Sequence, residues 1–299
     1  MAANRFGAWL AARRVPRVAF IAGFFNLGLF GIVSTAVVIL AAISRGWRVA
    51  AVDCLIAVAL LAGLAIASGG GWQLLVMSAG TLWPVAIGLG SLTGKFGTLT
   101  LPIQALLLVA MVLVVSFYIV VGDTVAYWTT TLKLLAAELE AAGLELGSPD
   151  ALTAWAPLMT GLMAALAVMS LVLALVLGSW WAGGMGAPGL GQMFRQLRLG
   201  NVIGAAAAVA GIASLAGAGQ VASDLLLVLA TGFVLQGLAV IHWQANARRL
   251  PRALLLLVYL PMLPLLAGPA IAGDAWLTVA AIGFIDNWFV LRRGNENMI

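Results

Sequence analysis

The stretch AWLTVAAIGFIDNWFVLRR, residues 275–293, is a long apolar run that ends at two arginines. A helix needs about 20 apolar residues to cross the hydrocarbon core of a bilayer, and basic residues favour the cytoplasmic side. The stretch therefore predicts a membrane-spanning helix whose C-terminal end lies in the cytoplasm. Asp286 precedes the arginines by about six residues, so its carboxylate would lie roughly 9 Å below their level. An acid at that depth needs a partner.

The composition extends this interpretation to the whole chain. Of its 299 residues, 64% are hydrophobic and only 8% are charged, and the mean hydropathy is +1.12. A soluble domain carries about a quarter charged residues, so this chain has too little polar surface to cover a water-soluble globule. The excess of basic residues indicates membrane topology and not a nucleic-acid partner. We expect an all-α, polytopic transmembrane helix bundle whose partner is the lipid bilayer.

About eight segments are long and apolar enough to be full spans. They lie near residues 49–68, 72–93, 99–122, 152–178, 200–217, 222–246, 252–272 and 275–291. We divide the chain into an N-terminal segment, a first membrane part, an external excursion and a second membrane part. Their ranges are 1–19, 20–122, 123–151 and 152–299.

The basic residues also predict the topology of the N-terminal segment. With the C-terminal arginines inside, alternation of the spans leaves most other arginines inside and most acids outside. The arginines among residues 1–19 then share the cytoplasmic side only if residues 20–43 enter and leave by one face. Gly23, Asn26 and Gly28 are suited to break that segment. We expect a re-entrant or hairpinned first segment, and a single ordinary span with an external N-terminus is the alternative.

Two segments have the character of surface helices. Residues 1–19 combine arginines with aromatic and aliphatic side chains, which is typical of a basic interfacial segment. Within 123–151, Leu132, Leu135 and Leu139 recur at helical spacing between polar residues. This pattern predicts an external amphipathic helix that lies on the membrane or covers the bundle.

Three ionisable side chains on different predicted helices share one depth. Asp53 follows Arg48 by five residues and His242 precedes Arg248 by six. Together with Asp286, they would lie roughly 7–9 Å below the inner boundary. We predict that they converge on one ligand-binding site. Further hydrogen-bonding groups on the same helices are Gln236, Gln244, Asn246 and Asn287.

Helical spacing suggests charge partners for this site. His242, Asn246 and Arg249 follow an i, i+4, i+7 stripe, and Asp286 shares a face with Arg293. An acid in the hydrocarbon core costs about 2.5–3.5 kcal/mol on insertion scales, so we expect Arg249, Arg293 or the imidazole to pair with it. The alternative is that the acids are structural locks between helices and that the histidine only packs.

Other chemistries find little support in the sequence. One histidine and the single Cys54 beside Asp53 cannot supply the three or four ligands of a typical metal site. The glycines of WPVAIGLGSLTGKFG lie in no strand–helix unit, so they form no nucleotide fingerprint. We expect no metal, no cofactor and no hydrolytic catalytic residues.

The C-terminal third carries a family resemblance. It reads GFVLQGLAVIHWQANARRLPRALLLLVYLPML, residues 232–263, followed by GFIDNWFVLRR. Gln236-Gly237-Leu238, His242, Leu250-Pro251 and the Gly283, Asp286 and Arg292 of the last span resemble the YybS-like family of bacterial membrane proteins, also described as a domain of unknown function numbered 2232. That family is grouped with the substrate-binding membrane subunits of energy-coupling-factor vitamin transporters, which usually have about six spans.

The resemblance implies a multi-pass protein of the bacterial inner membrane with a small-molecule or transport role, and the basic residues put both termini in the cytoplasm. Our first hypothesis is therefore a transporter-like or small-ligand-binding membrane subunit. The alternative is a membrane scaffold or assembly partner that docks another membrane protein or a second copy of itself. A weaker alternative is an enzyme on lipid-linked substrates, with Asp286 as its candidate acid.

Overall fold

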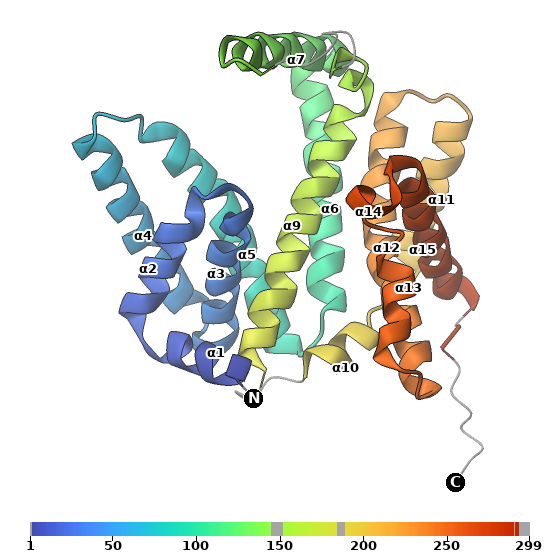
Figure 1. Cartoon of the computed structure of the whole chain (residues 1–299), viewed down its shortest axis with the longest axis horizontal. Helices are drawn as coiled ribbons and strands as arrows, with labels where there is room; N and C mark the ends of the chain where they lie inside the picture. The colour runs from blue at the N-terminus through green and yellow to red at the C-terminus, as the bar shows by residue number, and fades with distance from the viewer. Residues whose placement is uncertain (1, 145–151, 184–188, 290, 293–299) are drawn as a thin grey trace.

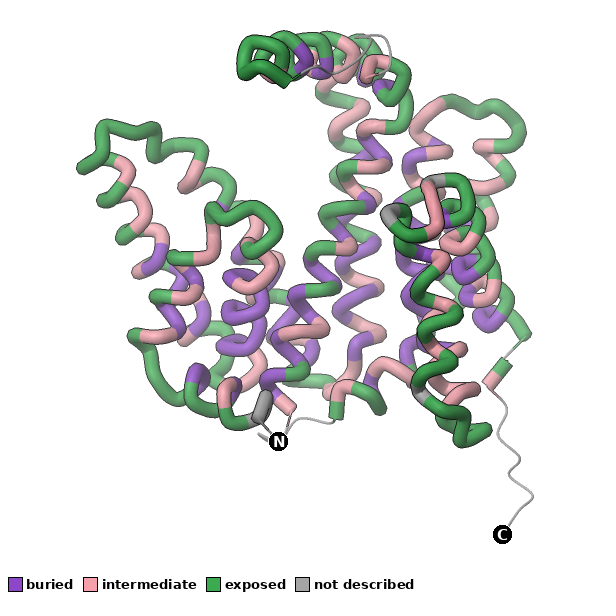
Figure 2. The backbone as a smooth tube through the Cα atoms, viewed as in Figure 1, coloured by how far each residue is buried: buried purple, intermediate pink, exposed green. Residues whose placement is uncertain are grey.

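The computed structural model describes residues 2–144, 152–183, 189–289 and 291–292. Throughout these residues the regular structure is helical, without a β-strand. The expected all-α class is therefore confirmed. Burial is concentrated in the middle of the bundle, whereas the upper ends of several helices are exposed (Figure 2).

The first five helices form an N-terminal unit. They are α1 (Ala2–Ala12), α2 (Arg14–Phe25), α3 (Gly31–Arg45), α4 (Trp47–Ala67) and α5 (Gln73–Phe96). The chain reverses between α2 and α3 through a short 3-10 turn, Gly28–Phe30, so these two helices form a hairpin (Figure 1). Its second arm belongs to a segment, Gly28–Arg45, that is long and apolar enough to cross a membrane, and re-entry by one face stays a prediction. The hydroxyl of Ser34 donates to the carbonyl oxygen of Ile21 at 2.7 Å and joins the two arms of the hairpin. The first arm starts at Arg14, earlier than the predicted boundary at residue 20.

Two long helices stand in the middle of the molecule, α6 (Thr100–Val121) and α9 (Met159–Ala182). Across their upper ends lies α7 (Thr124–Ala141), which projects sideways from the bundle (Figure 1). The carboxylate of Asp123 accepts a hydrogen bond from the backbone N–H of Ala126 at 2.9 Å and caps this helix. A helix is thus present over the described part of the predicted segment 123–151, and residues 145–151 lie outside the described residues. That it is external stays a prediction.

The C-terminal unit contains α10 (Leu190–Arg195), α11 (Gly200–Leu215), α12 (Gln220–Ala247) and α15 (Pro269–Phe289). Helices α12 and α15 approach each other at two glycines. A Cβ atom at Gly237 would collide with the carbonyl oxygen of Val279, and one at Gly283 would collide with that of Phe233. Small residues let the two backbones come this close.

Six helices among the described residues are long and apolar enough to cross a membrane. They are Gly28–Arg45, Trp47–Ala67, Gln73–Phe96, Thr100–Val121, Ala156–Ala182 and Gln220–Ala247. The expected count of about eight spans is not confirmed. The predicted span at 200–217 is a shorter apolar helix, Gly200–Leu215.

The predicted span at 252–272 is wrong as a continuous helix. The chain there is divided into η3 (Arg252–Leu255), α13 (Leu256–Tyr259) and α14 (Pro264–Ala267). Pro261 and Pro264 lack a backbone N–H and clash with a preceding helical turn, and Gly268 has φ +80°. We call residues 250–268 the strap, because they run beside α12 and join it to α15 (Figure 1).

Candidate functional site

Asp286 on α15 is the centre of a buried hydrogen-bond network. Its side chain is 1% exposed and forms an ion pair with Arg292, whose Nη2 lies 2.5 Å from Oδ2. Gln236 Nε2 on α12 donates to the same oxygen at 2.9 Å. The expected partner Arg249 does not contact this carboxylate, and Arg293 lies outside the described residues. Arg292 pairs with Asp286 instead, because its side chain reaches back along the end of α15 to the carboxylate.

This network holds the linker between α10 and α11, residues 195–200. Arg292 donates to the carbonyl oxygens of Arg195 at 2.7 Å and Leu197 at 2.8 Å. The other bonds come from neighbouring amides and an arginine: Leu199 N–H to Gln236 Oε1 at 2.8 Å, Asn287 Nδ2 to the Gly200 carbonyl at 2.9 Å, and Arg198 Nη2 to the Asn287 carbonyl at 3.1 Å. We call Gln236, Asp286, Asn287 and Arg292 the linker clasp. Its polar groups bind protein backbone, so its observed role is structural.

Asp53 belongs to a different network. Its fully buried carboxylate contacts Arg17 Nε at 2.7 Å and Arg14 Nε at 3.1 Å, both from α2. Arg17 also donates to the carbonyl oxygen of Ala11 at 2.5 Å. We call this cluster the N-terminal lock, because it ties α1, α2 and α4 together.

The prediction of a site shared by Asp53, His242 and Asp286 is therefore wrong. Helix α4 packs against α2, α3 and α5, whereas α15 packs against α11, α12 and α14. The pair α6 and α9 stands between the two groups (Figure 1). Equal depth along three helices fixes one coordinate only, and it leaves their positions in the plane of the membrane open.

Other predicted residues do come together, in a cavity of about 480 Å³ beside the C-terminal end of α12. His242 and Asn246 line it from one face of α12, as their i, i+4 spacing predicts. Arg249 also lines it, but from two residues beyond the end of α12, where its φ is 52°, so the predicted i+7 helical step does not account for its position. Arg195 lines it from the end of α10. Within the described residues, neither arginine forms an ion pair with an acid. We call this the basic cavity.

Arg195 was not among the predicted site residues. Its only sequence signal is its place in the basic run FRQLR, residues 194–198, which is equally typical of an ordinary cytoplasmic loop. The structure gives it a defined position, since Arg292 holds its carbonyl oxygen. The linker clasp therefore fixes the backbone at one wall of the basic cavity.

The imidazole of His242 is held by both of its nitrogens. Nδ1 lies 2.9 Å from the carbonyl oxygen of Leu238. A carbonyl can only accept, so Nδ1 carries the hydrogen and Nε2 of the neutral ring is the acceptor. The hydroxyl of Tyr259 on the strap lies 3.4 Å from Nε2. The rings of Phe194 and Tyr259 meet the imidazole edge-on at 5.4 and 5.9 Å, which orients it at the cavity wall.

Arg249 has an unusual backbone conformation, with φ 52°. It follows the C-terminal end of α12, where Leu250 N–H donates to the Ala245 carbonyl at 2.8 Å. This left-handed helix ending usually contains glycine, and a side chain there costs roughly 1–2 kcal/mol. Strained residues of this kind are concentrated at functional sites. This backbone conformation places Arg249 in the lining of the basic cavity.

Gln244 lies next to the basic cavity but does not line it. Its Nε2 donates to the carbonyl oxygen of Leu291 at 2.9 Å, and it borders a second, largely apolar cavity of about 400 Å³.

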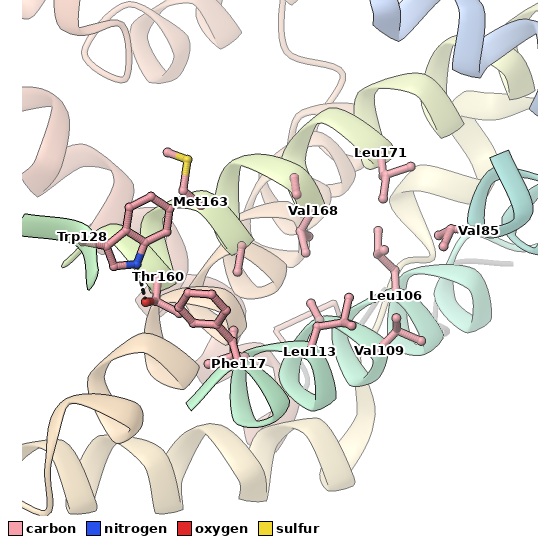
Figure 3. Close-up of a pocket in the computed structure, with 14 residues that line it drawn as sticks. Val85, Leu106, Val109, Leu113, Phe117, Trp128, Thr160, Met163, Val168 and Leu171 are labelled. Atoms are coloured by element: carbon pink, nitrogen blue, oxygen red, sulfur yellow. Dashed lines mark hydrogen bonds between the residues drawn. The ribbon is translucent and has the colours of Figure 1, made fainter. Parts of the chain in front are cut away.

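A third cavity of about 240 Å³ lies between α5, α6, α7 and α9. Figure 3 shows its aliphatic walls and the hydrogen bond from Trp128 Nε1 to Thr160 at 2.9 Å. It has no ionisable lining residue.

Groups of three or more metal-binding side chains are absent from the described part of the chain. Comparison with family models, with curated proteins and with solved structures finds no match. The resemblance to the YybS-like family stays a prediction. Inference about function therefore rests on the geometry of the basic cavity.

Proposed function

We propose that this chain is a ligand-binding, transporter-like membrane protein and that its basic cavity binds an anionic group of the ligand. The observation that carries the proposal is the meeting of Arg195, His242, Asn246 and Arg249 around one cavity, with neither arginine paired to an acid in the described residues. Guanidinium groups bind carboxylate and phosphate through two parallel hydrogen bonds. An anionic ligand would supply the missing partner.

The linker clasp supports this proposal because it makes one wall of the cavity rigid before any ligand arrives. Arg292 holds the Arg195 carbonyl, and Gln236 and Asn287 hold the backbone of Leu199 and Gly200. A wall that is already ordered loses less conformational entropy when a ligand binds. The four clasp residues would thus act on affinity through positioning and not through contact with the ligand.

Topology gives further support. The resemblance to the YybS-like family implies the bacterial inner membrane, and we propose that both termini lie in the cytoplasm, because that arrangement keeps most arginines inside. Helices α1 and α10 lie at the end of the bundle opposite α7 (Figure 1). The basic cavity, beside α10, would then open at the cytoplasmic face.

Binding of pyrophosphate to the purified protein in neutral detergent tests the proposal. We expect pyrophosphate to raise the Tm at constant ionic strength, since a ligand at 100 times its Kd stabilises the folded state by about 2.7 kcal/mol. The double variant Arg195→Gln/Arg249→Gln should lose this shift. Arg45→Gln is the matched control, because Arg45 is exposed at the end of α3 and does not line the basic cavity. An equal shift in all three proteins would overturn the proposal.

A further inference from the structure

The apolar cavity of about 400 Å³ is adjacent to the basic cavity. Both are lined by Ala245, Leu250 and Leu255. Beyond this shared boundary, the apolar cavity is formed by α12, the strap, α15 and Leu291. Its wall is mostly aliphatic, with Val240, Leu254 and Ile282 among its residues, and Gln244 and Arg248 are its polar members. Each cavity has a volume within the range of about 300–1,000 Å³ that is typical of ligand pockets.

The helical spacing on α12 explains why two cavities of opposite character lie next to each other. His242 and Asn246 lie on one face, with Arg249 just beyond the end of the helix, and Ile241 and Gln244 lie on the neighbouring face. Ala245 lies between the two faces. Its side chain is only a methyl group, which separates the two cavities on α12 with little bulk. A single ligand can therefore extend from one cavity into the other.

The strap indicates where the apolar cavity opens. Five of its leucines that do not line the cavity are exposed: Leu256, Leu257, Leu260, Leu263 and Leu266. In a chain with only 8% charged residues, such a row of leucines faces hydrocarbon and not water. A ligand would therefore reach the apolar cavity sideways, from the lipid phase.

We infer that the ligand of the basic cavity is an anionic amphiphile, with a phosphate head between Arg195 and Arg249 and a hydrocarbon chain in the apolar cavity. This inference rests on the proposed function, and it adds the class of ligand. The bilayer supplies phosphate-headed amphiphiles next to the strap. A zwitterionic head brings its own cation, which opposes the two unpaired arginines, so an anionic head binds more tightly than a zwitterionic head on identical chains.

Native mass spectrometry in neutral detergent can measure this preference with dioleoyl phosphatidic acid and dioleoyl phosphatidylcholine, which carry the same chains. We expect phosphatidic acid to bind at least about tenfold more tightly than phosphatidylcholine, and also more tightly than the chain-free pyrophosphate. The variant Leu254→Gln places an amide in the apolar cavity and should weaken phosphatidic acid binding by about tenfold. Its pyrophosphate binding should be unchanged, which also shows that the variant is folded.

The matched control is Leu257→Gln, because Leu257 lies on the same strap, is 69% exposed and lines neither cavity. It should bind both lipids and pyrophosphate as the unaltered protein does. If phosphatidic acid binds no better than pyrophosphate, or if Leu254→Gln behaves as Leu257→Gln does, the ligand is a soluble anion and the inference is overturned while the proposed function stands. Insensitivity of pyrophosphate binding to Arg195 and Arg249 would overturn the proposed function and, with it, this inference.

Discussion

The N-terminal lock and the linker clasp each contain an aspartate paired with an arginine, but the two networks lie in different surroundings. Asp53 and Asp286 are both buried, and each forms an ion pair with arginine. The lock joins helices of one unit. The clasp forms hydrogen bonds with the backbone of the linker between α10 and α11. Arg195 at the start of that linker lines the basic cavity together with Arg249, and neither arginine pairs with an acid within the described residues.

Burial of a charge does not by itself mark a binding site. A buried acid that already has its arginine offers little attraction to a ligand, and removal of one partner leaves an uncompensated charge. An unpaired arginine at a cavity has donors to offer. Among the described residues, Asp53 and Asp286 are paired with arginine and hold helices together, whereas Arg195 and Arg249 line a cavity and have no acid partner there, which makes them the candidates for function.

Replacement of Arg292 should have the largest effect. Arg292→Met leaves Asp286 buried without its cation and also releases the carbonyls of Arg195 and Leu197. We expect a loss of about 3–5 kcal/mol in unfolding free energy, together with weaker pyrophosphate binding and faster hydrogen exchange at residues 197–200. Arg198→Met is the control, because it removes one exposed donor and should cost about 1 kcal/mol. Equal effects of the two variants would show that the clasp does not hold the linker.

Replacement of Asp53 should be nearly as destabilising but leave the ligand site intact. Asp53→Asn removes the anion beside the buried Arg17, while its amide oxygen can still accept a hydrogen bond. We expect a loss of about 3 kcal/mol, at the lower end of the range for a broken buried pair. Pyrophosphate affinity, measured below the lowered Tm, should be unchanged. A matching fall in affinity would mean that the two networks are coupled, against the separation described above.

The smallest effect on stability, with the opposite sign, is expected at Arg249. Arg249→Gly removes the side chain from a left-handed conformation, which should stabilise the protein by up to about 1 kcal/mol after the extra chain entropy of glycine is subtracted. The same change should weaken pyrophosphate binding. A higher Tm with lower affinity is the expected pair of results in thermal melting and titration. Unchanged affinity would remove Arg249 from the ligand site.

Much of the architecture could be predicted from local pattern. Long apolar runs predicted the positions of α4, α5, α6 and α12 within about three residues, because each run contains the length of one span. For α9 the predicted start at residue 152 was seven residues too early, since the helix begins at Met159. The break near Gly28 followed from glycine and asparagine in an apolar segment. Apolar length alone failed at 252–272, where Pro261 and Pro264 interrupt the helix that hydropathy predicts.

The candidate site was predictable only where it follows a single helix. His242 and Asn246 line one cavity because four residues make about one turn of α12, whereas Arg249 reaches it from the left-handed backbone beyond the end of that helix. Three features of the site depend on how separate segments pack in the fold. They are the place of Arg195 in the cavity wall, the pairing of Asp286 with Arg292, and the distance of Asp53 from both. Periodicity carries no information on which helices are neighbours.

The sequence by itself determined that this chain is a helical membrane protein, where most helices begin and end, and which residues share a face of α12. These properties depend on transfer of side chains from water to lipid and on the helical repeat, both of which act locally. The tertiary structure alone decided that Arg14 and Arg17 pair with Asp53, that Arg292 pairs with Asp286, and that Arg195 and Arg249 have no acid partner within the described residues. Those outcomes depend on the lateral packing of helices, which is set by side-chain shape at contacts such as Gly237 with Val279.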